Sequence, residues 1–181
     1  MPEEHAVLLE RGGRSVLRFE RSLPHSRERV WRALTERKEL AAWHPTPFEL
    51  EPRAGGTIAF QAPAGMPAWP PGRVLACEEP SLLVHTWGPP PEDELRWTLS
   101  ERDGGCLLTL EHHFADRFKA ARDGAGWHLC LRGLEALLDG TEVPAKGDPR
   151  ELPEGWGELN EEYLARFGIA AQDATGVPGS D

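Results

Sequence analysis

A hairpin-forming segment in the middle of the chain and a long amphipathic helix near its end constrain the fold most. Residues 48–60, Phe-Glu-Leu-Glu-Pro-Arg-Ala-Gly-Gly-Thr-Ile-Ala-Phe, are typical of two short strands that turn at a glycine pair. Residues 126–138, Gly-Trp-His-Leu-Cys-Leu-Arg-Gly-Leu-Glu-Ala-Leu-Leu, repeat apolar side chains at helical spacing. Together they suggest a curved antiparallel sheet that grips one helix. Such an architecture encloses a cavity, so the default function is to hold something apolar.

The remaining elements fit the same α+β plan. Alternating apolar and polar residues predict strands at about 15–23, 47–52, 56–62, 73–79, 82–87, 94–101 and 106–114. Asp103-Gly104-Gly105 is the strongest hairpin signal. Helical spacing predicts two short helices between residues 26 and 43, a long helix at 118–138 and a short one at 156–167. We therefore expect six or seven antiparallel strands curved around the long helix, with two short helices after the first strand.

The same reading divides the 181 residues into four parts. Residues 1–14 are an N-terminal extension, and residues 15–140 are the domain in which the sheet curves around the long helix. Residues 141–168 are a polar connector with a short docking helix, since apolar residues in 156–167 recur every three to four positions. Residues 169–181 are predicted to be a disordered tail.

Charge and cysteine content exclude several classes of function. The formal net charge of −10 argues against nucleic acid and against anionic membrane surfaces, both of which need a basic face. No long apolar run or charged-then-apolar leader is present, so no membrane insertion is expected. The three cysteines lack paired spacing and lie in apolar segments, as in a reduced cytoplasmic protein.

The predicted inner faces of the elements indicate which residues would line a cavity. Alternate residues of the strands at 94–101 and 106–114 share one face, and the long helix presents one apolar stripe. The candidate lining residues are Trp43, Trp87, Leu95, Trp97, Leu99, Leu108, Leu110, His112, Trp127, Leu131 and Leu134. Ordinary core packing of these residues is the alternative interpretation.

Few polar groups on these faces could act as an acid, a base, a nucleophile or a metal ligand. His112 is the best candidate for a ligand anchor or an acid/base group, and a histidine bonded to a backbone carbonyl is the alternative. His112, His113 and His128 do not converge on one ion, because neighbouring strand residues face opposite ways, so no metal and no other cofactor is expected. Cys130 has no evident base beside it, and the Gly55-Gly56 pair more plausibly bends a strand than binds phosphate. No catalytic residue is assigned.

Several segments in order resemble a known family. Residues 28–36 (Glu-Arg-Val-Trp-Arg-Ala-Leu-Thr-Glu), 40–45, 48–57, 72–75, 79–87 and the Gly-Trp that opens the helical pattern at 126 are similar to the activator-of-heat-shock-chaperone-ATPase homologue branch of the SRPBCC superfamily. The resemblance covers about residues 15–140 and implies the helix-grip fold of START-like lipid-transfer domains. One departure is Glu51, where the family usually has Asp.

Three classes of function follow. The favoured one is a protein that binds a small apolar or amphipathic molecule between the sheet and the long helix. The resemblance suggests a chaperone-cofactor domain, in which a chaperone or another protein is the partner; a homodimer is a further alternative. A cyclase or hydrolase that uses His112 is the third class, although inward-facing ionisable groups are scarce.

Overall fold

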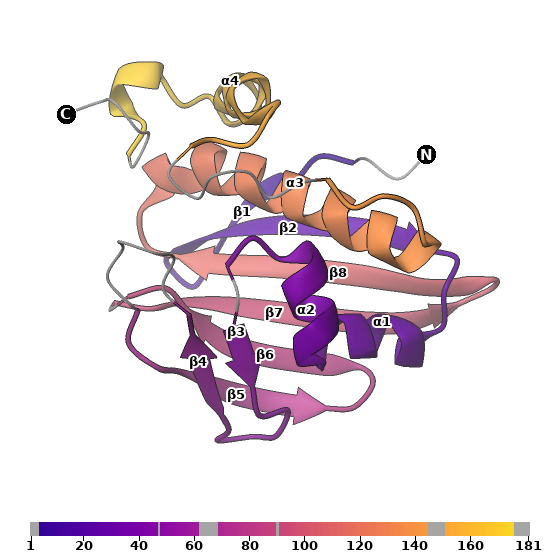
Figure 1. Ribbon diagram of the computed structural model, residues 1–181. Coiled ribbons are helices and arrows are strands. Elements are labelled where there is room, and N and C mark those ends of the chain that lie inside the picture. Colours follow the sequence, from indigo (N-terminus) through magenta and orange to yellow (C-terminus); the bar gives the residue numbers. More distant parts are fainter. Residues whose placement is uncertain (1–3, 47, 62–68, 90, 145–150, 176–181) are drawn as a thin grey trace.

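The fold is an eight-stranded antiparallel sheet with the strand order β1-β2-β8-β7-β6-β5-β4-β3. This computed structural model describes residues 4–46, 48–61, 69–89, 91–144 and 151–175 (Figure 1). The strands are β1 (Val7–Arg11), β2 (Arg14–Leu23), β3 (Phe48–Leu50), β4 (Thr57–Phe60), β5 (Gly72–Glu78), β6 (Leu82–Trp87), β7 (Asp93–Arg102) and β8 (Gly105–Phe114). In the described part of the chain no helix has both the length and the apolar character needed to cross a membrane.

Two short helices link β2 to β3, and a long one follows β8. Helix α1 (Arg27–Thr35) begins after Ser26, whose hydroxyl accepts a hydrogen bond from the backbone N–H of Arg29 at 3.2 Å. Helix α2 (Arg37–Trp43) follows directly. A 3₁₀ turn, η1 (Arg117–Lys119), leads into α3 (Ala120–Asp139), which ends at Gly140 in the left-handed conformation.

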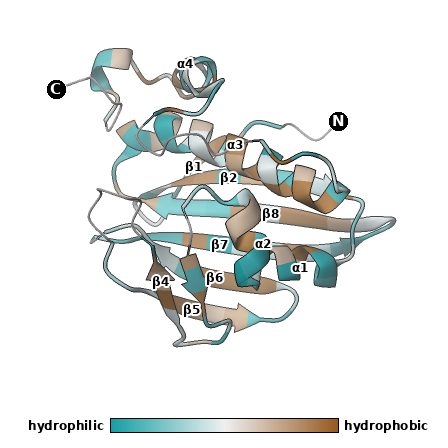
Figure 2. Cartoon of the chain, in the orientation of Figure 1, coloured by the Kyte–Doolittle hydropathy of each residue, from teal (hydrophilic) through white to brown (hydrophobic). Residues whose placement is uncertain are grey.

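Helix α3 packs across the sheet and is covered on its other side by α4 (Trp156–Phe167), as Figure 1 shows. The core between α3 and the sheet contains fully buried residues such as Phe19, Leu110 and Leu131. In Figure 2 the last residues of β8 are hydrophilic, whereas its first half is largely hydrophobic. The polar end of β8 marks the region where charged groups gather.

The predicted fold class is confirmed: the structure is an α+β helix-grip fold with a long helix near its end. The predicted number of strands is wrong, because residues 7–11, assigned to an N-terminal extension, form β1. This strand pairs with β2 through a Gly12-Gly13 turn, and both glycines have positive φ angles (58° and 77°). Glycine pairs at such turns are a hairpin signal, but the run Val-Leu-Leu-Glu-Arg lacks the alternation that marks a half-buried strand.

The C-terminal part of the chain is packed against the domain. The hydroxyl of Tyr163 in α4 accepts a hydrogen bond from the backbone N–H of Ala6 (3.0 Å) and lies 3.0 Å from Nδ1 of His128 in α3. After α4, residues 171–173 form a 3₁₀ turn and Ile169 is buried, so this part of the expected disordered tail has a defined position. Residues 176–181 lie outside the described residues.

Candidate functional site

The space between the sheet and α3 is filled by side chains. The predicted inner faces of β7 and β8 lie side by side in register, pairing Leu95 with His112, Trp97 with Leu110 and Leu99 with Leu108. The internal cavity measures only about 10 Å³, room for about one water molecule. Five of the predicted lining residues surround it: Trp43, Trp87, Leu95, Trp97 and Trp127.

The other predicted lining residues of this interior take part in packing. Leu99, Leu108, Leu110, Leu131 and Leu134 are each at most 2% exposed and line neither this cavity nor the larger pocket described below. Aromatic rings therefore occupy much of the volume in which a large cavity was expected between the sheet and the helix. Trp97 meets Trp43 and Trp127 edge-to-face, with ring centroids 6.3 and 5.7 Å apart.

Each of these buried indoles donates its N–H inside the protein. Trp43 donates to the carbonyl of Ala33 at 2.9 Å. Trp97 donates to Nε2 of His85 at 3.2 Å, and Trp127 donates to Nδ1 of His112 at 3.1 Å. These three indole N–H groups are thus paired inside the protein, as most buried polar groups are.

The two histidines are held in opposite tautomers by these contacts. Nε2 of His85 accepts from Trp97, so its hydrogen is on Nδ1 and is donated to the carbonyl of Thr86 at 2.9 Å. Burial lowers the pKa of His85 to about 4, which keeps the ring neutral. His112 accepts at Nδ1 and donates from Nε2 to Oδ2 of Asp93 at 3.0 Å.

A larger, open pocket lies beside the N-terminal half of α3. Its volume is about 330 Å³. It is bounded by α3, the last residue of β6, the first residue of β7, the segment after α2 and the start of α4. Four tryptophans, Trp69, Trp87, Trp127 and Trp156, form its apolar walls. We call this space the tryptophan pocket. Its remaining lining residues include His44, Pro45, Thr46, Gly88, Pro89, Asp93, His112, Lys119, Arg122, Asp123, Gly126 and Cys130.

Three of the four tryptophan rings of the pocket are in contact with one another. The ring of Trp87 is perpendicular to that of Trp69, with centroids 5.3 Å apart. The centroids of the Trp87 and Trp127 rings are 5.5 Å apart, and these two rings are tilted relative to each other. Edge-to-face contacts of this kind add to the energy of apolar burial. Trp69, Trp87 and Trp127 therefore form one continuous aromatic wall.

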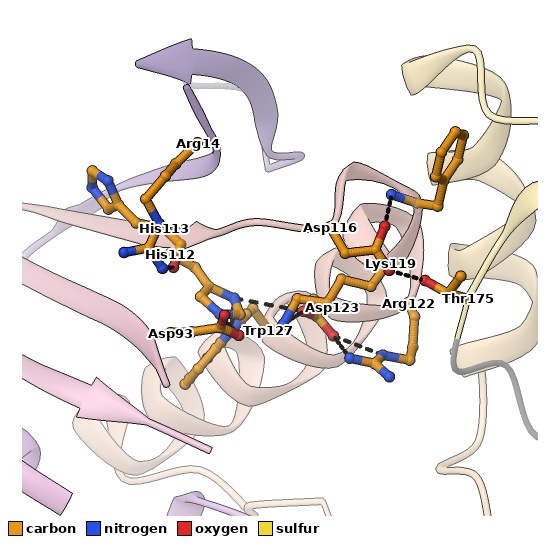
Figure 3. A network of polar contacts seen from close by, with 11 residues as sticks. Arg14, Asp93, His112, His113, Asp116, Lys119, Arg122, Asp123, Trp127 and Thr175 are labelled. Atoms are coloured by element: carbon orange, nitrogen blue, oxygen red, sulfur yellow. Dashed lines mark hydrogen bonds and ion pairs between the residues drawn. The ribbon is translucent and has the colours of Figure 1, made fainter. Parts of the chain in front are cut away.

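Charged side chains from β7, η1 and α3 form the polar end of the pocket (Figure 3). The ammonium group of Lys119 contacts Oδ2 of Asp93 and lies 3.4 Å from Oδ2 of Asp123. Arg122 binds Oδ1 of Asp123 through Nε at 2.8 Å and Nη2 at 2.7 Å. Burial by itself would raise the pKa of the Asp93 carboxyl, but hydrogen bonds from His112 and Lys119 outweigh burial and lower that pKa. Asp93 is therefore a carboxylate at neutral pH.

Asp93, His112 and Asp123 are also a set of possible metal ligands, with one atom of each within 4.8 Å of the others. In this structure Lys119 supplies the positive charge between the two carboxylates. Both ring nitrogens of His112 are engaged in hydrogen bonds. A metal ion would have to displace these contacts, and the expectation that the protein holds no metal remains a prediction.

Trp87, His112 and Trp127 were predicted from the sequence as site residues, whereas the charged residues around them were not. The missed residues are Asp93, Lys119, Arg122 and Asp123. Lys119 and Asp123 stand four residues apart, the spacing that brings opposite charges together on a helix. Asp93 had no comparable signal, because its approach to α3 depends on how the helix crosses the sheet.

Other sequence candidates fall elsewhere. His113 lies 3.6 Å from Glu111 and outside the pocket lining, while His128 is buried and its Nδ1 lies 3.0 Å from the hydroxyl of Tyr163 in α4. Burial lowers the pKa of His128 to about 4. Cys130 lines the pocket and is half-buried. Gly55 lies between β3 and β4 and has a positive φ of 77°. This agrees with the expectation that the glycine pair bends the chain and does not bind phosphate.

Comparisons with solved structures show the same fold. CalU16 from Micromonospora echinospora superposes with a TM-score of 0.70 at 23% sequence identity, covering 91% of this chain and 96% of its own. A conserved protein of unknown function, EF2215 from Enterococcus faecalis, gives 0.70 at 19% identity, covering 91% and 92%. The product of gene BPP1335 from Bordetella parapertussis gives 0.68 at 28% identity, covering 91% of each chain.

Sequence comparison gives the family. No curated protein matches the chain. Residues 24–139, which run from the turn before α1 to the end of α3, match the family described as activator of Hsp90 ATPase homolog 1-like protein. This match spans well over half of the 181 residues. The chain therefore belongs to the family of activator of Hsp90 ATPase homolog 1-like proteins.

Proposed function

We propose that the protein binds a small amphipathic molecule in the tryptophan pocket. The observation that supports this most directly is the joint presence of a continuous aromatic wall and a compact polar end in one open space of about 330 Å³. Pockets for small ligands have volumes of about 300–1,000 Å³ and combine mostly apolar walls with a few placed polar groups. The apolar part of the ligand would lie against Trp87 and Trp127, and its polar part would face Lys119 and Asp93.

The buried interior does not offer an equivalent site. Its cavity of about 10 Å³ would need displacement of close-packed tryptophans before any ligand entered. Placing the ligand in the open pocket moves the site from the middle of the sheet to the ends of the central strands β6, β7 and β8. Of the residues inferred from sequence, Trp87, His112 and Trp127 belong to this site.

Gly126 provides a direct test, because it lines the pocket and a Cβ atom placed there would meet no atom within 4 Å. A Gly126→Leu side chain should project into the pocket without a clash, and leucine favours a helix more than glycine does. Gly157 in α4 is the matched control, since it is exposed, also has no atom within 4 Å of a Cβ, and lies outside the pocket lining.

The experiment titrates the protein with fatty acids, sterols and polycyclic phenols and follows tryptophan fluorescence. At least one class should saturate the parent and the Gly157→Leu variant, whereas Gly126→Leu should lose the response while keeping its melting temperature. If no class saturates the parent, or if Gly126→Leu binds as well as the parent, the pocket is not a ligand site.

The family match supports a second candidate, a chaperone cofactor. This function predicts that the purified protein changes the ATPase rate of an Hsp90-type chaperone. Because such an effect needs no occupied pocket, Gly126→Leu should leave it intact. Stimulation that persists in Gly126→Leu, together with a parent that binds no small molecule, would favour the cofactor function.

A further inference from the structure

Strand β1 forms one edge of the sheet, and in the described part of the chain no further strand lies beyond it. It pairs with β2 from Val7 to Arg11 in one continuous register, without a bulge. The opposite edge strand, β3, has only three residues. Because the unpaired backbone groups of an edge are a template for another strand, shortness protects β3 from association. The longer and regular β1 is therefore the edge that is suited to pairing.

The turn between β1 and β2 determines which backbone groups of β1 face the open side. Both of its glycines have positive φ angles, as in a type I′ turn, and Arg11 is directly opposite Arg14. The backbone hydrogen bonds that close such a turn join Arg11 to Arg14, and in an antiparallel pair every second residue bonds to the same neighbour. Leu8 and Glu10 fall between these bonded residues. Their N–H and C=O groups therefore point away from β2.

The side chains along β1 leave apolar surface at the same edge. Val7 is 46% exposed, and Leu9 follows it on the same face of the sheet. A groove of about 330 Å³ lies beside the strand, and its lining residues are Ala6, Val7, Leu8, Arg117, Arg166 and Phe167. Two guanidinium groups thus lie beside backbone groups that face no neighbouring strand.

We propose that two copies of this chain pair through β1, antiparallel and in the register that places Leu9 opposite Leu9 of the second copy. In this register Leu8 lies opposite Glu10 of the second copy, and the two residues exchange both backbone hydrogen bonds. A two-fold axis repeats the same exchange, so the two sheets become one continuous sheet with the closed symmetry that is commonest among homodimers. The pairing uses neither the tryptophan pocket nor its ligand.

Charge complementarity supports a second copy as the occupant of this edge. In the proposed register Glu10 of one copy lies beside Leu8 of the other, at the groove that Arg117 and Arg166 line. A carboxylate of each copy is thereby brought to the two guanidinium groups of the other. The contact occurs twice because of the two-fold axis, and complementary charges of this kind fix the register of an interface.

The end of β1 next to α4 favours this register over its neighbour. The backbone N–H of Ala6 is already bonded to the hydroxyl of Tyr163 in α4. Centring the pairing on Leu8 would place Glu10 of the second copy opposite Ala6, where that N–H has no hydrogen left to donate. Centring it on the next residue places Gly12 of the second copy there instead. A glycine brings no side chain toward α4.

Sedimentation equilibrium of the full chain, from about 1 to about 500 μM, tests the pairing. The mean mass should rise from the 20.1 kDa of one chain toward twice that value. Glu10→Pro removes an outward N–H from each copy and no bond to β2, so the dissociation constant should rise at least about tenfold. Glu10→Thr loses the same charge but keeps the N–H, and should weaken the dimer less. A parent that stays monomeric, or a Glu10→Pro protein that dimerises as tightly as the parent, would overturn the proposal.

Amide hydrogen exchange in the parent locates the interface without any substitution, so it does not depend on how well Glu10→Pro folds. The amides of Leu8 and Glu10 should exchange at least about tenfold more slowly where the protein is dimeric than where it is monomeric. The amides of Val7 and Leu9 are internal controls, because they are bonded to β2 in both states, and should change less. Equal changes at all four amides would mean that the copies associate through another surface, which would refute pairing through β1.

Discussion

The indole nitrogen of Trp127 lies 3.1 Å from Nδ1 of His112 and donates its hydrogen to that atom. This bond joins α3 to β8 at the boundary between the filled core and the open pocket. It also fixes the orientation of the imidazole, so that Nε2 faces Asp93 at 3.0 Å. One buried hydrogen bond thus connects the packing of the core with the charged end of the site.

The first prediction concerns the tautomers of the two buried histidines. Nitrogen NMR of the imidazole rings should show the hydrogen of His112 on Nε2 and that of His85 on Nδ1. The other ring nitrogen of each histidine accepts an indole hydrogen, from Trp127 and Trp97 respectively. Trp127→Phe should release the constraint on His112 alone and lower the free energy of unfolding by about 1–3 kcal/mol, since Nδ1 loses its donor. Identical tautomers in the parent protein would contradict the assignment.

The second prediction compares two glycines in α3. Gly126→Ala should raise the free energy of unfolding by about 0.5–1 kcal/mol, because alanine favours the helix and its Cβ meets nothing within 4 Å. Gly124→Ala should instead lower it by about 1 kcal/mol or more, since its Cβ would lie 3.2 Å from the Tyr163 ring. Urea unfolding measures both variants. A stabilising Gly124→Ala would show that α4 is free to move away from α3.

The third prediction tests whether the interior is solid. Leu131 is fully buried, so Leu131→Trp should lower the free energy of unfolding by about 1–3 kcal/mol through overpacking. Leu152→Trp is the control, because Leu152 is 48% exposed and should tolerate the larger side chain. A Leu131→Trp protein as stable as the parent would reveal a large internal space.

The fourth prediction concerns the attachment of α4. Tyr163→Phe removes the hydroxyl shared by the backbone N–H of Ala6 and Nδ1 of His128, leaving both groups buried and without it. The free energy of unfolding should fall by about 1–3 kcal/mol, and hydrogen exchange at Ala6 should become faster. If both quantities match the parent, this contact does not hold the N-terminal segment to α4.

The fifth prediction is a dependence of stability on pH. Burial lowers the pKa of His85 to about 4, whereas an unfolded histidine titrates near about 6.5. Between these values the unfolded chain binds a proton that the folded chain does not, so stability is lost as the pH falls from about 6.5 to about 4, by up to about 3 kcal/mol for this group.

His85→Gln should flatten this loss in urea unfolding measured from about pH 7 to about pH 4.5. The flattening should be partial, because the pKa of His128 is also lowered to about 4. A slope identical to that of the parent would mean that His85 is protonated in the folded protein over this range.

The amphipathic patterns were sufficient to predict most of the fold. Alternation placed Leu95, Trp97 and Leu99 on one face, and the structure pairs them with His112, Leu110 and Leu108 of the neighbouring strand. These patterns are local, since a strand repeats every two residues and a helix every 3.6. Alternation did not predict β1, because its hairpin with β2 depends on the Gly12-Gly13 turn more than on alternating side chains.

The candidate site was only partly predictable. The sequence indicated Trp87, His112 and Trp127, but it placed them around a central cavity that tryptophan rings fill. Whether a set of apolar side chains leaves a void depends on their volumes and rotamers after packing, which a linear pattern does not contain. The pocket that is open lies where α3, α4 and the strand ends converge.

By itself, the sequence determined the order of the elements from β2 onward, most of the inward-facing residues and the family resemblance, because each depends on local spacing and residue type. Only the tertiary structure decided which charges meet. Asp93 and Lys119 are 26 residues apart and come into contact because η1, which leads into α3, lies beside the start of β7. Coulombic attraction and burial act through space, so the network of Asp93, Lys119, Arg122 and Asp123 arises from the fold and not from any motif in the chain.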